Sequence, residues 1–419
     1  MNATAGDTRY TQMTQAQVDA MCLKHERLRA MKPGGARAVF AWCDLSGLNL
    51  SGRVLIDADF TAAMLVETDL RGAVLDSCNL YCADLQLANL SGASMRRADL
   101  RGASLRGANL SDCDLFEADL REGALAMPDK RAGLSYVEIA MRSSEASHAN
   151  LRGANLDRSK LSGIQAMKAD FTDATMKSCK LVRANLKQCI MDNCDLAGAD
   201  LSGADLSGAS LRDAVLIGAK TDMWRTSQTD MTGMLTDKPM GADIKDMPYG
   251  QMLQDHALWV DTLGKSGTPS KFDQADLRGL GTIKGLNLAA LSAKGAVFYG
   301  LDMRGVQLQG AHLEEADLRN CNLAGADLRG ARLFKARLDG ANLEGADLGA
   351  LKIDATRFLP ADLRETRMRN VNFSKADMKL ARLDGADISR SNLEGTLMNL
   401  EALEHVTCAG MRGRIASPG

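Results

Sequence analysis

The stretch ADLQLANLSGASMRRADLRGASLRGANL, from Ala83 to Leu110, decides the fold, because one five-residue unit, A-(D/N/S)-L-x-x, fills it without interruption. A leucine or methionine recurs every five positions, and an alanine stands two positions before each of them. A period of five fits neither an α-helix, which repeats about every 3.6 residues, nor a flat strand, which alternates about every two. The period fits a coil whose sides are each one repeat long and whose two apolar residues per repeat point inward.

The same register holds over three long blocks. Seventeen consecutive centres run from Leu45 to Leu125, fourteen from Leu151 to Leu216, and twenty-three from Leu288 to Met398. The outward positions hold mainly Asp, Asn, Ser, Arg and Gly, which suit solvent-facing turns. A narrow bore also accounts for an aromatic content of only 4%. The pattern therefore predicts an all-β solenoid.

These units resemble those of the pentapeptide-repeat family. The resemblance covers about two thirds of the chain, because 54 repeats account for 270 of the 419 residues. It implies a right-handed quadrilateral β-helix with four repeats in each turn. Arg53 occupies a small inward position, so we expect a distorted first turn.

A short helix is predicted ahead of each repeat region. Thr14 and Gln17 have the spacing of a capping box at the start of the first helix. The residues expected on its buried face are Val18, Cys22, His25 and Leu28. A second segment, Tyr249 to Gly267, repeats this arrangement, and its expected buried face holds Leu253, His256, Ala257 and Val260. His25 and His256 thus correspond, and we expect both to have a structural role in two tandem rods with short α-helical caps.

The predicted organisation has five parts. They are an N-terminal helical cap at 1–40, a first solenoid at 41–220 with an inserted ear at 126–148, a Met-rich joint and second helical cap at 221–272, a second solenoid at 273–400, and a C-terminal cap with a flexible tail at 401–419.

Two of these segments are candidates for contact with partners. The ear is predicted to be a β-hairpin, because a turn-forming run, PDKRAG, precedes an alternating run, LSYVEIAM. Its mixed polar and aromatic residues Lys130, Arg131, Tyr136 and Glu138 are candidate contact residues. The alternative is a passive insertion that a robust solenoid tolerates. For the Met-rich segment 221–247, a lid over the end of the first rod is expected, with a partner-binding surface as the alternative.

The sequence offers no constellation for catalysis. Seven cysteines fall on small inward positions, where they replace alanine: Cys43, Cys78, Cys113, Cys179, Cys189, Cys194 and Cys321. Cys82 falls on an outward position and is the candidate for a reactive thiol. No C-x-x-C, H-E-x-x-H, phosphate-binding or nucleophile motif occurs. We therefore expect no enzyme, no cofactor and no metal site, and the free thiols favour a reducing cytoplasm.

The net charge and the hydropathy of the chain limit the kinds of partner that it could bind. The formal net charge is −2, which argues against direct nucleic-acid binding, and no apolar run approaches the roughly 18 residues of a membrane span. We expect a non-catalytic protein-interaction scaffold with an unknown protein partner, and the ends of the solenoids could also join two copies as a homodimer. The alternative, implied by resemblance to the quinolone-resistance members, is a DNA mimic that interacts with a topoisomerase such as gyrase. Residues 44–125 carry a net charge of −6. This is about half the charge of duplex DNA over the roughly 20 Å of coil that these residues are expected to form. The low charge density disfavours the DNA mimic.

Overall fold

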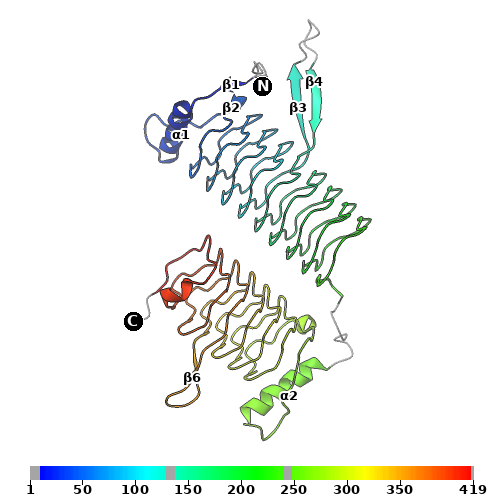
Figure 1. The fold of residues 1–419 in the computed structure, drawn as a ribbon, viewed down its shortest axis with the longest axis vertical. Coiled ribbons are helices and arrows are strands. Elements are labelled where there is room, and N and C mark those ends of the chain that lie inside the picture. Colours follow the sequence, from blue (N-terminus) through cyan, green and yellow to red (C-terminus); the bar gives the residue numbers. More distant parts are fainter. Residues whose placement is uncertain (1–9, 129–136, 239–247, 417–419) are drawn as a thin grey trace. The chain divides into compact units, whose positions relative to one another are not determined.

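The computed structural model describes residues 10–128, 137–238 and 248–416 and divides into two compact units, Met1–Lys238 and Pro239–Gly419. Each unit is a right-handed quadrilateral β-helix, in which parallel bridges join residues 20 positions apart (Figure 1). Asp59, for example, bridges Asn79, which in turn bridges Asp99. Four five-residue repeats therefore make one turn, and the predicted fold class is confirmed.

The sides of each coil meet in tight turns of one kind. The N–H of Leu48 donates to the carbonyl of Leu45 at 3.1 Å, and Gly47 between them has a φ of 69°. A positive φ at the third residue defines a type II turn, which glycine adopts most easily. Where the repeat has no glycine, other residues adopt this conformation, such as Leu87 with a φ of 57°.

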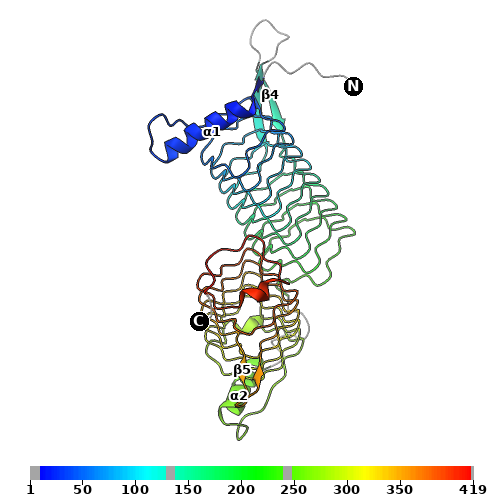
Figure 2. The ribbon, with the colours of Figure 1, turned by 60° about the vertical axis from the view of Figure 1, so that its left-hand side comes forward.

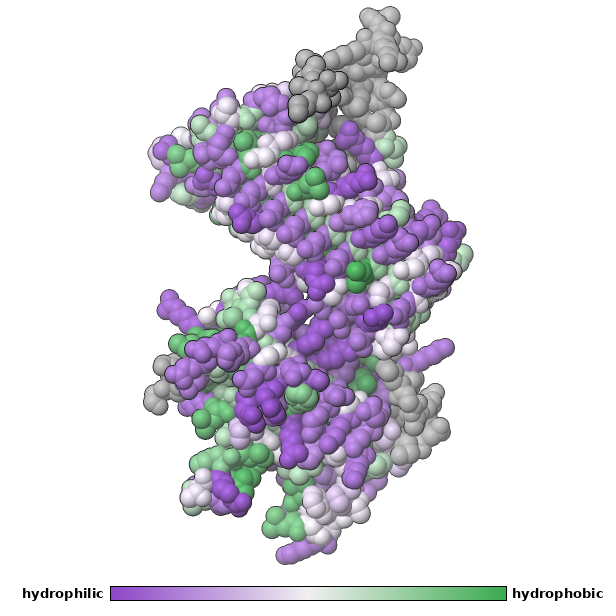
Figure 3. Space-filling model, viewed as in Figure 1, coloured by the Kyte–Doolittle hydropathy of each residue, from purple (hydrophilic) through white to green (hydrophobic). Residues whose placement is uncertain are grey.

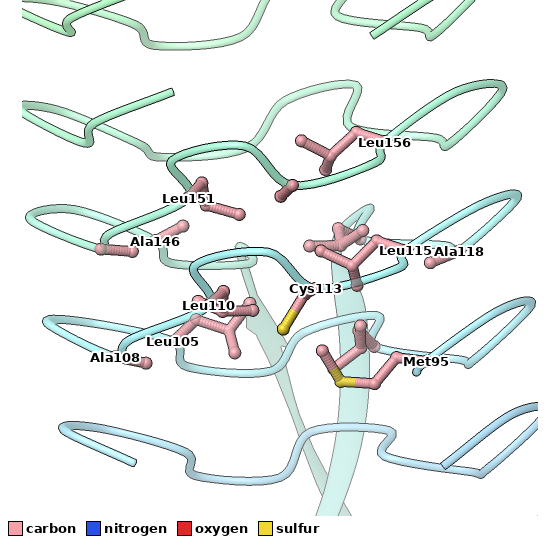
Figure 4. Packing of buried hydrophobic residues seen from close by; sticks show 14 of the residues in the cluster. Met95, Leu105, Ala108, Leu110, Cys113, Leu115, Ala118, Ala146, Leu151 and Leu156 are labelled. Carbon is pink, nitrogen blue, oxygen red and sulfur yellow. The ribbon is translucent and has the colours of Figure 1, made fainter. Parts of the chain in front are cut away.

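The bore is filled by the two inward residues of each repeat (Figure 4). Where a centre is only alanine, the inward residue two positions earlier is large. Ala166 follows Ile164, and Ala293 follows Leu291, and all four are buried. The summed volume of each pair is thereby kept, as close packing requires.

Several polar residues at the small inward position donate to the carbonyl of a bore residue in the preceding turn. Thr68 Oγ1 donates to the Leu45 oxygen at 2.9 Å, and Cys78 Sγ donates to the Leu55 oxygen at 2.9 Å, in each case 23 residues earlier. The seven cysteines predicted to replace alanine are all buried. A bonded thiol or hydroxyl is therefore tolerated in the bore, because its polar hydrogen has a partner.

The first cap is helix α1 (Gln15–Arg29), and a short strand, β1 (Thr11–Gln12), pairs in parallel with β2 (Cys43–Asp44) at the start of the coil. The capping box is present, and Val18, Cys22 and His25 are buried as predicted. Leu28 is 45% exposed, so its predicted place on the buried face is wrong. Figure 2 shows α1 lying across the end of the first coil.

The second cap is helix α2 (Tyr249–Asp261), whose Leu253 and His256 are buried as predicted, while Ala257 and Val260 are half-buried. The Tyr249 ring packs on Phe272 with ring centroids 5.8 Å apart. A 3₁₀ turn, η2 (Arg278–Leu280), interrupts the first turn of this coil, and a second, η3 (Leu400–Leu403), lies near its end. Among the described residues, no helix has the length and apolar character that crossing a membrane requires.

Both coils extend beyond their predicted ends. Bridges join Asp205 to Arg225 and Val215 to Leu235, so residues 221–235 continue the first coil and do not form a joint. In the second unit, Leu397 bridges Ala416, so most of the predicted flexible tail is part of the coil. Residues 239–247 of the predicted joint lie outside the described residues.

In the described ranges, two β-hairpins leave the coils. The first hairpin consists of β3 (Gly123–Pro128) and β4 (Val137–Arg142), and the second of β5 (Leu351–Lys352) and β6 (Phe358–Leu359). The bridge from Ser104 to Glu145 spans 41 residues instead of 20, and that from Arg332 to Asp362 spans 30. The first insertion therefore adds 21 residues and the second adds ten.

The bounds of the predicted ear need correction. Leu125, predicted as a bore residue, lies in β3, whereas Ser144 and Ala146, predicted within the ear, are buried in the coil. The excursion from the first coil therefore lies between Glu122 and Ser144.

Candidate interaction surfaces

The outer walls of the coils are lined by ion pairs that the repeat itself creates. An aspartate before a bore residue pairs with an arginine two positions later. The pairs are Asp69–Arg71, Asp99–Arg101, Asp119–Arg121, Asp276–Arg278, Asp302–Arg304, Asp317–Arg319, Asp327–Arg329 and Asp362–Arg364. Figure 3 shows mainly hydrophilic walls on the face in view.

In several of these pairs the arginine lowers the pKa of the aspartate. Hydrogen bonds from the Arg304 side chain lower the pKa of Asp302 to about 2. For Asp317, which is buried, the charge and hydrogen bonds of Arg319 lower the pKa against the opposing effect of burial. Within the described ranges, no group of three or more His, Cys, Asp or Glu side chains could hold a metal ion.

The first hairpin is fixed to the wall by Tyr81. The Tyr81 hydroxyl donates to the Ala124 carbonyl at 2.7 Å and accepts from the Ala124 N–H at 2.6 Å. The Arg101 guanidinium lies over the Tyr81 ring, 5.2 Å from its centroid. Tyr81 thus completes the backbone bonding of a residue that has just left the coil.

Two glycines allow this hairpin to leave close to the wall. A Cβ on Gly102 would lie 3.1 Å from the Gly123 Cα, and Gly102 has a φ of +67°. Where the chain re-enters the coil after β4, Ser144 Oγ donates to the Arg121 carbonyl at 2.7 Å and accepts from the Gly102 N–H at 2.9 Å. The chain is therefore fixed both where it leaves the coil and where it returns.

The four predicted contact residues fall on or near this hairpin. Lys130, Arg131 and Tyr136 lie outside the described residues. Glu138 lies in β4, and its backbone pairs with Met127. Their role in contact with a partner stays a prediction.

Cys82, predicted to be exposed and reactive, is buried beside Ala62, with Trp42 and Tyr81 packed against them. Burial raises the pKa of the Cys82 thiol above its ordinary value, which disfavours the nucleophilic thiolate. The prediction of a reactive thiol is therefore wrong.

The repeat pattern does not predict the second hairpin. Its ten-residue length equals two repeats, so the five-residue phase continues through it, and Ile353 and Phe358 fall where bore residues are expected. In the structure they are 52% and 55% exposed. Two signals were available: a leucine, Leu351, at a small inward position, and Pro360 two residues after Phe358.

This hairpin packs against two glycines in the coil wall, Gly330 and Gly310. A Cβ on Gly330 would lie 2.9 Å from the Leu351 Cβ and 3.1 Å from the Leu359 carbonyl oxygen. A Cβ on Gly310, one turn earlier, would lie 3.9 Å from the Leu351 Cδ2. The hairpin therefore packs against the preceding turns of the coil, and its Ile353 and Phe358 are exposed to solvent.

A shallow polar groove lies between α1 and the first turn. Arg53 turns out of the bore and bonds Asp19 of α1 at 2.7 Å, which relieves the distortion expected there. Gln15 Nε2 donates to the Asn49 carbonyl at 2.8 Å, and Gln15 Oε1 accepts from the Asn49 N–H at 2.9 Å. The groove's side chains thus serve to close the edge of the coil, and we assign it no ligand.

Comparison with known proteins agrees with this architecture. A family model described as pentapeptide repeats matches residues 36–75, 54–92, 83–122, 147–188, 179–218, 311–349 and 361–399, which together cover more than half of the chain. No curated protein sequence matches the chain.

Several solved structures are similar. HetL from the cyanobacterium Nostoc, a pentapeptide-repeat protein involved in the regulation of heterocyst differentiation, is 24% identical over 73% of this chain and 89% of HetL, with a TM-score of 0.25. Rfr23 from the cyanobacterium Cyanothece is 27% identical over 33% of this chain and 88% of Rfr23, with a TM-score of 0.17. Full-length QnrB1, a plasmid-mediated fluoroquinolone resistance protein, is 19% identical over 54% of this chain and 98% of QnrB1, with a TM-score of 0.27.

Proposed function

This chain belongs to the pentapeptide-repeat family, and from that membership we propose that it is a non-catalytic scaffold that binds protein partners through its two hairpins. The observation that carries the proposal is the contrast between hairpins and walls. The walls carry aspartate–arginine pairs of one kind at several places, such as Asp302–Arg304 and Asp327–Arg329, and a surface built from similar units offers a partner few distinctive places to bind. The hairpins break that repetition.

The second hairpin offers the better-defined contact. Ile353 and Phe358 are half-exposed apolar side chains, and Arg357 and Asp354 beside them form an ion pair. Apolar and aromatic anchors with a polar rim are typical of protein–protein contacts. In the first hairpin, Lys130, Arg131, Tyr136 and Glu138 are proposed as the corresponding contacts.

Charge supports this proposal over a DNA mimic. The acidic stretch 44–125 contains the pairs Asp69–Arg71, Asp99–Arg101 and Asp119–Arg121. Each such arginine lies beside its carboxylate, so these pairs interrupt the negative charge of the stretch. We also propose a reducing compartment such as the cytoplasm, because all ten cysteines are free. Association of two copies through coil ends stays a prediction.

Deletions that keep the repeat intact test the function. Removing residues 123–143 joins Glu122 to Ser144 and leaves one standard repeat from Leu120 to Ala146. Removing residues 351–360 joins Ala350 to Ala361 and restores the repeat from Leu348 to Leu363. As a matched control, removing 171–190 takes out one full turn and leaves both hairpins in place.

The measurement is affinity capture from an extract of the native cell, quantified by mass spectrometry, together with thermal unfolding of each variant. We expect captured partners to be lost on removal of one or both hairpins and retained in the control. Undiminished capture by a variant that lacks both hairpins and melts like the wild type would refute the proposal and direct the search to the walls.

A further inference from the structure

Each unit closes the start of its coil with a buried histidine that bonds the chain as it enters the first turn. His25 Nδ1 accepts the Ala38 N–H at 3.1 Å, and His256 Nδ1 accepts the Ser270 N–H at 3.1 Å. The two side chains belong to residues that are only 2% and 1% exposed. Each cap therefore contains the same hydrogen bond, from a backbone N–H to a histidine Nδ1.

The geometry fixes the protonation state of both rings. Because Nδ1 accepts a hydrogen bond, it carries no proton, and the proton of the neutral ring is on Nε2. His256 Nε2 lies 3.1 Å from the Ala289 carbonyl oxygen, to which it can donate. Within the described part of the chain, the buried His25 Nε2 has no hydrogen-bond partner, although the Ile56 backbone is near enough to the ring to act against the lowering of its pKa.

Protonation would be incompatible with these contacts. A proton on Nδ1 would point at a backbone N–H, so the bond would be lost and a charge would be buried without a partner. Around His25, the charged groups are Arg29 of α1, Arg37 of the incoming chain and Asp57 of the first turn. Asp57 is itself 3.8 Å from Arg29, so it offers His25 little net attraction. Cys22, the other titratable group on the buried face of α1, is a neutral thiol whose pKa burial raises to about 11.

The surroundings of His256 are less charged. The Trp259 ring lies beside it on α2, with centroids 5.7 Å apart, and the Ala289 carbonyl faces it from the coil. Burial lowers the pKa of His256, and the Ala289 carbonyl only partly opposes this. Burial is also the largest cause of the lowered pKa of His25.

We propose that His25 and His256 are pH-sensitive latches, and that proton uptake by each imidazole releases its cap helix and uncovers the first turn of the coil. Release of α1 would free the backbone of Asn49, which Gln15 now bonds, and would expose the apolar end of the bore beneath Val18 and Cys22. Such an edge can accept a strand from another chain. The inference does not depend on the proposed scaffold function.

The lowered pKa of each histidine determines whether acid or base opens the cap. The pKa of each histidine is lower in the folded protein than its ordinary value of 6.5. The stabilisation of each cap is therefore complete above that ordinary value and is lost as the pH falls toward the folded pKa. Since one proton is taken up per cap, the equilibrium constant for opening rises by up to about tenfold for each pH unit in that window.

Hydrogen exchange of the full chain tests the latch. With exchange rates corrected for the intrinsic effect of pH, we expect α1 and α2 to lose protection between pH 7.5 and 5, while the coil turns around Leu100 keep theirs. The variants His25→Asn and His256→Asn retain a side-chain acceptor but cannot take up a proton, so each should abolish the pH dependence in its own helix alone. His312→Asn, in a coil wall, is the matched control and should leave both caps as in the wild type.

Two results would overturn the proposal: caps whose protection does not change with pH, or an asparagine variant whose cap opens with acid as the wild type does. If an asparagine variant fails to fold, the titration of the wild-type imidazole protons by NMR decides. His25 and His256 must titrate below the ordinary value of 6.5, and titration near 6.5 would exclude the latch.

Discussion

Replacing Gly330 with alanine tests whether the second hairpin is seated on the coil wall. Gly330 has a φ of +65°, and an added Cβ would lie 2.9 Å from the Leu351 Cβ. Gly325, one repeat earlier, has a φ of +64° and nothing within 4 Å of an added Cβ. Both substitutions therefore carry the cost of a left-handed alanine, and only Gly330→Ala adds a clash with the hairpin.

The cost of a left-handed alanine and the cost of the clash with the hairpin differ in size. A left-handed alanine costs about 1 kcal/mol, and crowding at a packed site adds about 1–3 kcal/mol. For a unit of this size, 1 kcal/mol lowers the melting temperature by about 2–4 °C. We expect a loss of about 1 kcal/mol for Gly325→Ala and about 2–4 kcal/mol for Gly330→Ala.

Differential scanning calorimetry of the full chain measures the difference, and the deletion of residues 351–360 identifies its source. Without the hairpin, the two alanine variants should lose the same stability, because the clash has been removed. Equal losses in the intact protein, or unequal losses that persist without the hairpin, would refute the seating of the hairpin on Gly330.

Four further outcomes follow from the structure. Tyr81→Phe removes both hydrogen bonds to the Ala124 backbone, at a cost of about 1–3 kcal/mol; hydrogen exchange should rise in β3, and unchanged exchange there would contradict the anchoring role. Ala103→Phe overfills a fully buried position and should cost at least about 1–3 kcal/mol, so unaltered thermal unfolding would show that Ala103 does not face the bore. The pKa of Asp302, about 2, lies below the ordinary value of 3.8. The ionised Asp302 therefore stabilises the fold fully above pH 3.8, and this stabilisation is lost as the pH falls through about 2. The difference in unfolding free energy between wild type and Asp302→Asn should narrow over this range, and a constant difference would be inconsistent with the ion pair. Iodoacetamide should modify the half-buried Cys408 before the nine buried thiols, and early labelling of Cys82 would argue against its burial.

The five-residue period predicted the bore almost completely, because a side chain's place in the repeat decides whether it faces inward. The period could not reveal an insertion whose length is a multiple of five. Ile353 and Phe358 stay in phase and yet are exposed, whereas the 21-residue first insertion broke the phase and was visible. The sequence therefore located the first hairpin, with bounds a few residues off, and concealed the second.

The end of the first coil was missed for a different reason. Residues 221–235 lack the A-(D/N)-L signature and hold Thr226 and Met231 at the centres. Their backbones still bridge the preceding turn, as Arg225 does with Asp205. Backbone bonding does not depend on side-chain identity once a template turn is in place, so the signature underestimates the length of the coil.

The candidate site was predicted only where it repeats a local pattern. The buried state of Cys82 depends on Trp42 and Tyr81, which lie beside it in space but carry no period-five signal. The correspondence of His25 and His256 was visible because the two caps are duplicated, but their bonds to Ala38 and Ser270 required the structure.

The bridges between turns have a mechanical consequence. The backbone N–H groups of one turn donate to the next, as Leu50 does to Asp69, so these bonds run along the axis of the coil. A force pulling a coil along that axis loads its turns in series, and the weakest junction must fail first. Each failure frees one turn of 20 residues, whose extended length is about 70 Å, in place of about 5 Å along the coil. Under tension, each coil should therefore lengthen in evenly sized steps of one turn, beginning at an end, and should act as an extensible tether.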